Sequence, residues 1–232
     1  MLSVEDVRVA YGGVQAVRGV SLSVRDRQVV GLVGANGAGK TSLLNAITGL
    51  VPHRGRISFD GTAFSGFKTA DIVRRGVIQV AQGRQLFPDM TVLENLELGA
   101  FLQSPRNTEE TLATMFGRFP VLKGRAGQLA GTLSGGEQQM LAMARALMGR
   151  PKVLLVDEPC LGLSPKMVGV VGELIRQINA EGISVLVVEQ NTAFVFALAH
   201  HAYVIENGEV VLEGEPATLQ RDDRVRSAYL GI

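Results

Sequence analysis

The octapeptide GANGAGKT, at residues 34–41, restricts the folds open to this chain more than any other segment. It matches the pattern G-x-x-x-x-G-K-[ST], follows the short apolar run VVGLV, and precedes TSLLNAITGL, which has the character of a helix. A glycine-rich turn between a strand and a helix lets backbone N–H groups and the positive end of the helix converge on phosphate. The segment therefore predicts a strand, a phosphate-binding loop and a helix in that order.

Each residue of this loop is a candidate ligand of a nucleoside triphosphate. The glycines allow the backbone to wrap around the phosphates, Lys40 places a positive charge at the β- and γ-phosphates, and the Thr41 hydroxyl can bind Mg²⁺. A glycine-rich turn with a chance lysine is the alternative, which the flanking strand and helix disfavour. The candidate nucleotide-binding residues here are Gly34, Ala35, Asn36, Gly37, Ala38, Gly39, Lys40 and Thr41.

Alternation of strands and helices along the rest of the chain indicates an α/β fold. The segments KVLLVDEP and ISVLVVE each hold a run of apolar residues, as parallel strands covered on both faces do. Between them, Ser164 and Pro165 open a predicted helix that ends at Gly182. Its predicted buried face consists of Met167, Val170, Val171, Leu174, Ile175 and Ile178. The first thirty residues alternate apolar and polar side chains instead, which is typical of short antiparallel strands.

A helical segment interrupts this alternation. Residues from about 91 to 149 have helical periodicity, broken by a polar loop around 104–107, and the clearest helix follows Ser134 and is ended by Pro151. We therefore expect a single domain over residues 1–232. Residues 1–88 and 152–232 would form a β subdomain and the nucleotide-binding core, and residues of about 89–151 an inserted helical subdomain.

Two acidic residues stand at the end of the predicted strand KVLLVDEP. Ligands of α/β sheets bind at this edge, so Asp157 is a candidate ligand of Mg²⁺ and Glu158 a candidate general base for an attacking water. An exposed acidic pair at a strand end is common. Next to a phosphate-binding loop, however, the functional interpretation is strong.

A second candidate anion site lies at LSGGEQQ, residues 133–139. Ser134 and Glu137 fit the capping-box pattern S-x-x-E, and the two glycines between them leave the first-turn N–H groups of the helix uncovered. The alternative is a helix cap and nothing more. Two phosphate sites far apart in one sequence are economical if two chains face each other. The candidate residues are Leu133, Ser134, Gly135, Gly136 and Glu137.

Together these segments resemble the ATP-binding-cassette family of transporter ATPases. GANGAGKT looks like its Walker A motif, VLLVDEP its Walker B motif and LSGGEQQ its signature, in the family's order and across essentially the whole chain. The resemblance implies a P-loop NTPase (RecA-like) core with an N-terminal antiparallel β subdomain and an inserted α-helical signature subdomain. It also implies ATP and Mg²⁺ as cofactors, and a head-to-tail dimer with two ATP molecules between Walker A of one subunit and the signature of the other.

Further residues are assigned through the same resemblance. Tyr11 matches the aromatic residue that stacks on adenine, and Gln82 matches the glutamine that approaches Mg²⁺ and connects the two subdomains. Gln190 occupies the place where many relatives carry a histidine that contacts the γ-phosphate, so we expect Gln190 to take part in catalysis. A glutamine amide offers a donor and an acceptor, as neutral histidine does, but it cannot change charge near about pH 6.5. Ser164 stands where many members carry an aspartate.

The subfamily resemblance concerns function. AQGRQLFPDMTVLENLELGA, DEPCLGLSP, VVEQN and the ending RVRSAYLGI look like the shorter ATP-binding subunit of branched-chain amino acid importers. Such a subunit hydrolyses ATP at the cytoplasmic face of the cell membrane. It works with transmembrane permease subunits, with a second ATP-binding subunit (a longer paralogue or a second copy) and indirectly with a periplasmic or extracellular solute-binding protein. Importers of urea or short amides use similar subunits, and Gln82 replaces a glutamate that is frequent in the amino acid group.

Composition weighs against several other classes of protein. Lysine and arginine number 23 against 22 acidic residues, so the chain lacks the basic excess of a general nucleic-acid surface and we expect no nucleic-acid partner. The single cysteine, Cys160, allows no intrachain disulfide, and the apolar runs are far shorter than the roughly 20 residues of a membrane-spanning helix. A non-transport ATPase of the superfamily would usually show a coiled-coil insertion, zinc-binding cysteines or two cassettes. A scaffold that hydrolyses ATP poorly is disfavoured by Glu158.

Overall fold

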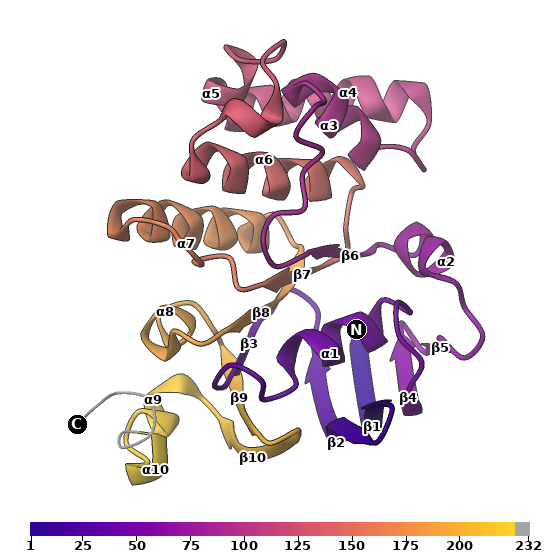
Figure 1. Cartoon of the computed structure of the whole chain (residues 1–232), viewed down its shortest axis with the longest axis vertical. Helices are drawn as coiled ribbons and strands as arrows, with labels where there is room; N and C mark the ends of the chain where they lie inside the picture. Colours follow the sequence, from indigo (N-terminus) through magenta and orange to yellow (C-terminus); the bar gives the residue numbers. More distant parts are fainter. Residues whose placement is uncertain (226–232) are drawn as a thin grey trace.

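The computed structural model describes residues 1–225 of the 232-residue chain (Figure 1). Residues 226–232, which contribute to the subfamily resemblance of the ending RVRSAYLGI, lie outside the described residues. A six-stranded sheet has the order β10-β9-β3-β8-β7-β6, and only the β9–β10 pair is antiparallel. Its strands are β3 (Val29–Val33), β6 (Val77–Val80), β7 (Val153–Asp157), β8 (Ser184–Glu189), β9 (His201–Glu206) and β10 (Glu209–Gly214).

The N-terminal part of the chain forms a separate antiparallel sheet in the order β2-β1-β4-β5. Its strands are β1 (Leu2–Tyr11), β2 (Val14–Val24), β4 (Arg54–Phe59) and β5 (Thr62–Ala63). Asp60 and Gly61 turn the chain between β4 and β5 with φ angles of 48° and 75°, as an Asp-Gly turn does. The α/β prediction with an N-terminal antiparallel sheet is confirmed.

Two hydrophobic cores cover the two faces of the six-stranded sheet. Alternate residues of β3 point into opposite cores: Val29 and Val33 into one, Val30 and Leu32 into the other. The first core also holds side chains of α6 (Gly135–Met148) and α7 (Pro165–Ala180), and the second those of α1 (Lys40–Ile47) and the antiparallel sheet. Each fully buried aliphatic side chain contributes about 1.5–3 kcal/mol, so burial on both faces holds the central strands firmly.

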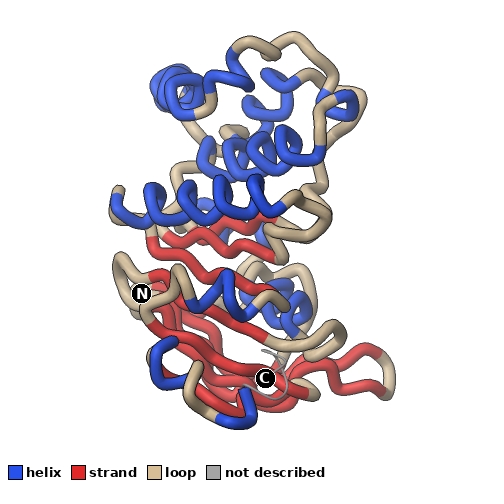
Figure 2. The backbone as a smooth tube through the Cα atoms, turned by 90° about the vertical axis from the view of Figure 1, so that its left-hand side faces the viewer, coloured by secondary structure: helices blue, strands red, loops and turns tan. Residues whose placement is uncertain are grey.

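Helices form a layer at one end of the molecule, away from the antiparallel sheet (Figures 1 and 2). This layer comprises α3 (Val92–Gly99), α4 (Pro105–Arg118), α5 (Pro120–Lys123), the 3-10 helix η1 (Ala130–Thr132) and α6. The predicted break in this helical segment exists, but it lies at 100–104 rather than at 104–107, because the Ser104 hydroxyl accepts a bond from the Asn107 N–H and Pro105 is the first helical residue. A serine cap followed by proline starts a helix rather than interrupting one.

The predicted buried face of α7 needs one correction. Val171, Leu174, Ile175 and Ile178 are buried and Met167 is half-buried, but the side chain of Val170 is 40% exposed. The buried residues follow an i, i+3, i+4, i+7 pattern, and Val170 lies about 100° around the helix from Val171. Apolar character alone does not place a residue on the core side.

The remaining helices are short. They are α2 (Thr69–Arg74), α8 (Thr192–Phe196), α9 (Pro216–Leu219) and α10 (Asp223–Val225). Across residues 1–225, none of the helices has both the length and the apolar character needed to span a bilayer.

Candidate nucleotide site

The carboxyl ends of four neighbouring parallel strands carry the candidate residues. In the order β3-β8-β7-β6, these ends lead into the 34–41 loop, into Gln190, into Asp157 and Glu158, and toward Gln82. Ligands of parallel α/β sheets bind at this edge. The structure therefore brings residues from positions 34 to 190 of the chain to one place, although the candidate residues of LSGGE are not among them.

The 34–41 loop is already arranged around its lysine. The Lys40 ammonium donates to the carbonyl oxygens of Gly34 and Ala35, each at 2.9 Å, and its side chain is buried. Gly39 has a φ of 104°, and a Cβ there would lie 2.3 Å from the Ala16 carbonyl oxygen, so only glycine fits. No side chain caps the N-terminus of α1, which leaves its first N–H groups available to phosphate.

Tyr11, the candidate adenine-stacking residue, ends β1 with 48% of its side chain exposed. An aromatic ring this exposed can present one face to a purine. A hollow of about 310 Å³ adjoins the loop. It is lined by Ala35, Asn36, Gly37, Ala38, Ile205, Glu206 and Asn207.

Asp157 is a buried carboxylate whose oxygens lack a hydrogen-bond partner in the described part of the chain. It is 1% exposed, and neither Oδ1 nor Oδ2 meets a donor with hydrogen-bond geometry among residues 1–225. Burial raises the pKa of Asp157 from 3.8 to about 6, the nearby Thr41 hydroxyl opposes this rise, and the charge of Glu158 adds to it. An unsatisfied carboxylate beside a hydroxyl and a phosphate-binding loop fits Mg²⁺, which takes one or two protein oxygens and completes its shell with phosphate and water. Within residues 1–225, no cluster of three acidic, histidine or cysteine side chains offers a metal site made of protein alone.

Asp157→Asn should raise the stability of the protein stripped of metal and nucleotide. Since the pKa of Asp157 rises on folding, the folded state holds this proton more tightly, and stability falls as the pH rises from about 4 to about 6. Asparagine removes the charged form, so we expect a gain of about 1–3 kcal/mol at pH 7.5 and little change near pH 4. Thermal unfolding in EDTA would show a midpoint about 2–8 °C higher at pH 7.5.

The exposed Asp89 provides the matched control for this experiment, because Asp89→Asn removes a carboxylate that is in water. An Asp157→Asn midpoint equal to or below that of the unmodified protein at pH 7.5 would contradict the assigned pKa.

Glu158 lies between two side chains from other motifs. Its Oε1 is 3.4 Å from the Lys40 ammonium, and its Oε2 accepts a 2.7 Å bond from the Gln82 amide. Glu158 has a φ of 46°, a left-handed conformation that is uncommon for a residue with a Cβ. Such strain at a residue held by its neighbours is a feature of functional sites. The strand end therefore directs the Glu158 carboxylate at the mouth of the 34–41 loop.

The end of β8 carries Glu189, Gln190 and Asn191. Gln190 is exposed at the strand end, and the Asn191 side chain caps α8 by accepting a 3.0 Å bond from the Phe194 N–H. Glu189 is buried and binds backbone N–H groups on two loops. Sequence reasoning assigned no role to Glu189.

The LSGGE segment begins α6 on the other side of the sheet from α1, as the two hydrophobic cores show (Figure 1). The Ser134 hydroxyl accepts a 3.4 Å bond from the Glu137 N–H, and the Glu137 carboxylate accepts a 2.9 Å bond from the Ser134 N–H. The capping box is thus formed. A Cβ on Gly136 would approach Met167 of α7 to within 2.8 Å, so this glycine permits close helix packing. One chain does not bring its LSGGE segment to its own phosphate loop.

Arg84 is a second residue that sequence reasoning missed. Its guanidinium donates to the Gln138 side chain on α6 at 3.0 Å and to the Leu161 carbonyl oxygen at 3.5 Å. Arg84 and Gln85 both have left-handed backbones, with φ of 67° and 43°. The side chain thus links the loop that holds Gln82 to the start of α6. The only sequence signal was a basic residue two positions after Gln82.

Ser164, which replaces an aspartate of many relatives, caps α7. Its hydroxyl accepts a 3.4 Å bond from the Met167 N–H. The neighbouring Cys160 is half-buried, and burial, with the Glu189 carboxylate second, raises the pKa of its thiol far above the ordinary value. A thiol with a raised pKa is unreactive, as expected for a structural cysteine.

The fold and this site define a nucleotide-binding ATPase with a phosphate loop, an acidic pair and a capped helix on a separate helical layer. The chain belongs to the ABC transporter family, whose model matches residues 17–161. As a member of this family it binds ATP. Cassettes of the family dimerise and work with membrane permeases.

Relatives and solved structures agree with this assignment. The chain is 43% identical to the high-affinity branched-chain amino acid transport ATP-binding protein BraG of Pseudomonas aeruginosa, over 100% of both chains. It is 33% identical to LivG of Escherichia coli, over 100% of this chain and 98% of LivG. An ATP-binding cassette of an ABC transporter in its ADP conformation superimposes with a TM-score of 0.87, at 31% identity over 100% of this chain and 99% of the other. A dimeric cassette bound to ADP and Pi has a TM-score of 0.83, at 25% identity over 93% and 99%.

Proposed function

We propose that this chain is the ATP-hydrolysing, energy-coupling subunit of an importer for branched-chain or other hydrophobic amino acids. The observation that carries the proposal is the 43% identity to BraG over the full length of both chains. The subunit would work at the cytoplasmic face of the membrane, attached to transmembrane permease subunits. A solute-binding protein on the opposite side would deliver the amino acid to the permease.

At the nucleotide, each candidate residue would have a separate task. Lys40 and the N–H groups of the 34–41 loop bind the β- and γ-phosphates, and Tyr11 stacks on adenine. Thr41, Asp157 and Gln82 would hold Mg²⁺, which supplies charge neutralisation at the phosphates when bound. Glu158 orients a water and takes its proton as the water oxygen attacks the γ-phosphorus and the bond to ADP breaks.

Gln190 would hold the γ-phosphate and the attacking water by its amide. Because an amide does not titrate, this contact would not switch with pH near neutrality. Leu133, Ser134, Gly135, Gly136 and Glu137 would face the nucleotide held by a second ATP-binding subunit. That the chain is also 34% identical to BraF of Pseudomonas aeruginosa, over 100% of this chain and 98% of BraF, supports a longer paralogue as the partner. A second copy of this chain is the other possible partner.

We further propose that residues of about 89–151 move as a unit against residues 1–88 and 152–232. The helical layer shares the first hydrophobic core with the six-stranded sheet and α7, and it also joins the rest of the chain through polar links. One is an ion pair between Arg118 of α4 and Glu181 after α7, and another is the contact of Arg84 with Gln138. Polar links of this kind can break and form, and the packed side chains of the shared core would have to slide past one another as the unit moves.

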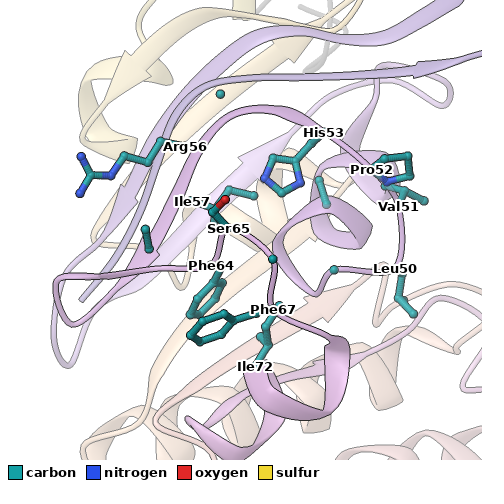
Figure 3. Close-up of a pocket in the computed structure, with 15 residues that line it drawn as sticks. Leu50, Val51, Pro52, His53, Arg56, Ile57, Phe64, Ser65, Phe67 and Ile72 are labelled. Carbon is teal, nitrogen blue, oxygen red and sulfur yellow. The ribbon is translucent and has the colours of Figure 1, made fainter.

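The permease would bind a groove of about 410 Å³ between the two subdomains. Three large apolar side chains stand exposed on it, Leu50 at 61%, Phe87 at 51% and Leu98 at 39%. A second hollow, of about 400 Å³, shares Leu50 with this groove and contains the stacked rings of Phe64 and Phe67 (Figure 3). No residue of the 34–41 loop lines either hollow, so this surface is separate from the nucleotide site.

Leu98→Glu should uncouple transport from hydrolysis. Leu98 is already partly exposed, so the substitution should leave the fold and the permease-free ATPase activity unchanged, but it would put a charge into an apolar interface. We expect leucine uptake by proteoliposomes that contain the permease to fall at least about tenfold. The matched control is Val211→Glu on β10, where the replaced side chain is 42% exposed and lies off the groove. Equal losses in both variants would reject the groove as the permease surface.

The same proteoliposomes distinguish the substrate classes. Gln82, in place of a glutamate frequent in the amino acid group, keeps urea and short amides as a second candidate. ATP-dependent uptake of labelled leucine but not urea would support the amino acid assignment, and the reverse would favour the amide importer. ATP hydrolysis that is independent of the permease but stimulated by DNA would reject both importer assignments.

A further inference from the structure

Glu189 is a buried carboxylate at the carboxyl end of β8 that the proposed chemistry does not use. Glu189 is 5% exposed, and within residues 1–225 its carboxylate forms no ion pair with a cationic side chain. An isolated buried carboxylate is costly unless hydrogen bonds hold its charge. Both Glu189 oxygens must therefore be engaged by nearby donors.

Those donors are backbone N–H groups from two loops, with the Cys160 thiol beside them as a further donor. Oε1 accepts a 2.8 Å bond from the Cys160 N–H, in the turn that follows the acidic pair. Oε2 accepts bonds of 3.0 Å from the Gln190 N–H and 3.4 Å from the Asn191 N–H. The backbone of Glu189 contributes as well: its carbonyl oxygen accepts a 3.3 Å hydrogen bond from the Gly34 N–H of the phosphate loop. One residue thus contacts three segments of the nucleotide site.

The side-chain bonds of Glu189 lie just beyond the end of the ladder between β7 and β8. The β7–β8 ladder ends where Asp157 pairs with Val188, and the Glu158 N–H makes a last 2.8 Å bond to the Val188 carbonyl oxygen. Beyond this point the segments that follow β7 and β8 separate, and no backbone ladder joins them. The Glu189 side chain takes over the connection, from the backbone of Gln190 to that of Cys160.

We propose that Glu189 is a positioning residue, which fixes the backbone of Gln190 relative to the turn that carries Glu158. The inference rests on the proposed roles of Glu158 and Gln190 and adds the group that sets the distance between them. Glu158 is two residues before Cys160, and Gln190 directly follows Glu189, so the linked segments are short and have little freedom. A carboxylate with two accepting oxygens holds both N–H groups at once.

Glutamine is a poor replacement here although its size is nearly the same. Both Glu189 oxygens face N–H donors, so a glutamine must turn its NH₂ group toward one of them. One link is then lost and two donors oppose each other. Glu189→Asp keeps two accepting oxygens on a side chain shorter by one methylene, which makes it the conservative variant.

The test is the steady-state ATPase activity of the full chain with Glu189→Gln, together with the Kd for a fluorescent ATP analogue. We expect kcat to fall about tenfold or more. The KM and the Kd should stay within about twofold, because the Lys40 contacts to the phosphate loop do not involve this carboxylate. Glu189→Asp should recover part of the lost kcat. The control is Glu109→Gln, at an exposed position on α4, which should change nothing.

A double variant separates positioning from a general loss of structure. If Glu189 acts through Gln190, then Glu189→Gln should lower kcat by less than about twofold in a Gln190→Ala background. Additive effects, or equal losses of nucleotide affinity and kcat with a lower melting temperature, would overturn the inference while leaving the proposed function intact. An unchanged kcat in Gln190→Ala alone would instead reject the proposed role of Gln190, and the inference with it.

Discussion

Glu158→Gln should reduce ATP hydrolysis by about 100- to 10,000-fold, the range that a general base contributes. The structure gives a physical reason for so large an effect. The Glu158 carboxylate is held by the Lys40 ammonium at 3.4 Å and the Gln82 amide at 2.7 Å, on a left-handed backbone that aims it at the phosphate loop. Glutamine preserves the shape but cannot accept a proton at neutral pH. ATP affinity should stay nearly unchanged, because in the proposed mechanism the phosphates contact Lys40 and the loop rather than Glu158.

Loss of hydrolysis with binding preserved should also trap the dimer. With ATP and Mg²⁺ present, light scattering should detect a stable dimer of Glu158→Gln, whereas the unmodified protein hydrolyses its ATP and separates. The matched control is Glu213→Gln at an exposed glutamate of β10, remote from the β7 end. Turnover near that of the unmodified protein would show that another group takes the proton.

Lys40→Ala should weaken ATP binding at least about 100-fold, since it removes the charge-assisted contact that we propose Lys40 makes to two phosphates. It also removes the donor that holds the Gly34 and Ala35 carbonyl oxygens at 2.9 Å. Without that donor these carbonyls can turn toward the phosphates and repel them. The ammonium thus contributes twice, by attracting the nucleotide and by keeping carbonyl oxygens away from it.

Titration calorimetry with ATP, in EDTA and then in Mg²⁺, would measure this loss. Lys123→Ala is the control, because Lys123 is an exposed lysine on α5. The melting temperature should be recorded as well, since Glu158 loses its buried cation in Lys40→Ala. If nucleotide affinity survived in a folded Lys40→Ala protein, residues 34–41 would not be the principal phosphate site.

Features that depend on neighbouring residues could be predicted from the sequence. The loop at 34–41, the capping box of Ser134 and Glu137, and the burial of β7 follow from short patterns with a direct physical cause. The α/β class and the family were therefore accessible before any coordinates were known. The polar segment at 104–107 was misjudged because one proline can end or begin a helix, and the choice depends on the cap before it.

Features that depend on strand order could not be predicted in the same way. Nothing in the sequence indicates that β8 lies between β3 and β7, so a carboxylate at 189 could not be placed beside the backbone of Cys160. The same holds for Arg84, whose partners on α6 and at Leu161 are 54 and 77 residues away. Long-range contacts of this kind come from topology, which single-sequence patterns do not determine.

The central place of β8 has a consequence for how this gene can change length. Val33 pairs with Glu189 on one side of β8, and Asp157 pairs with Val188 on the other. The two registers of β8 therefore fix the position of the phosphate loop relative to the acidic pair. One inserted codon at 184–188 would turn every following side chain to the opposite face of the sheet. We expect natural length variation to avoid this segment and to collect in surface connections between helices such as 101–104, where no strand register has to be kept.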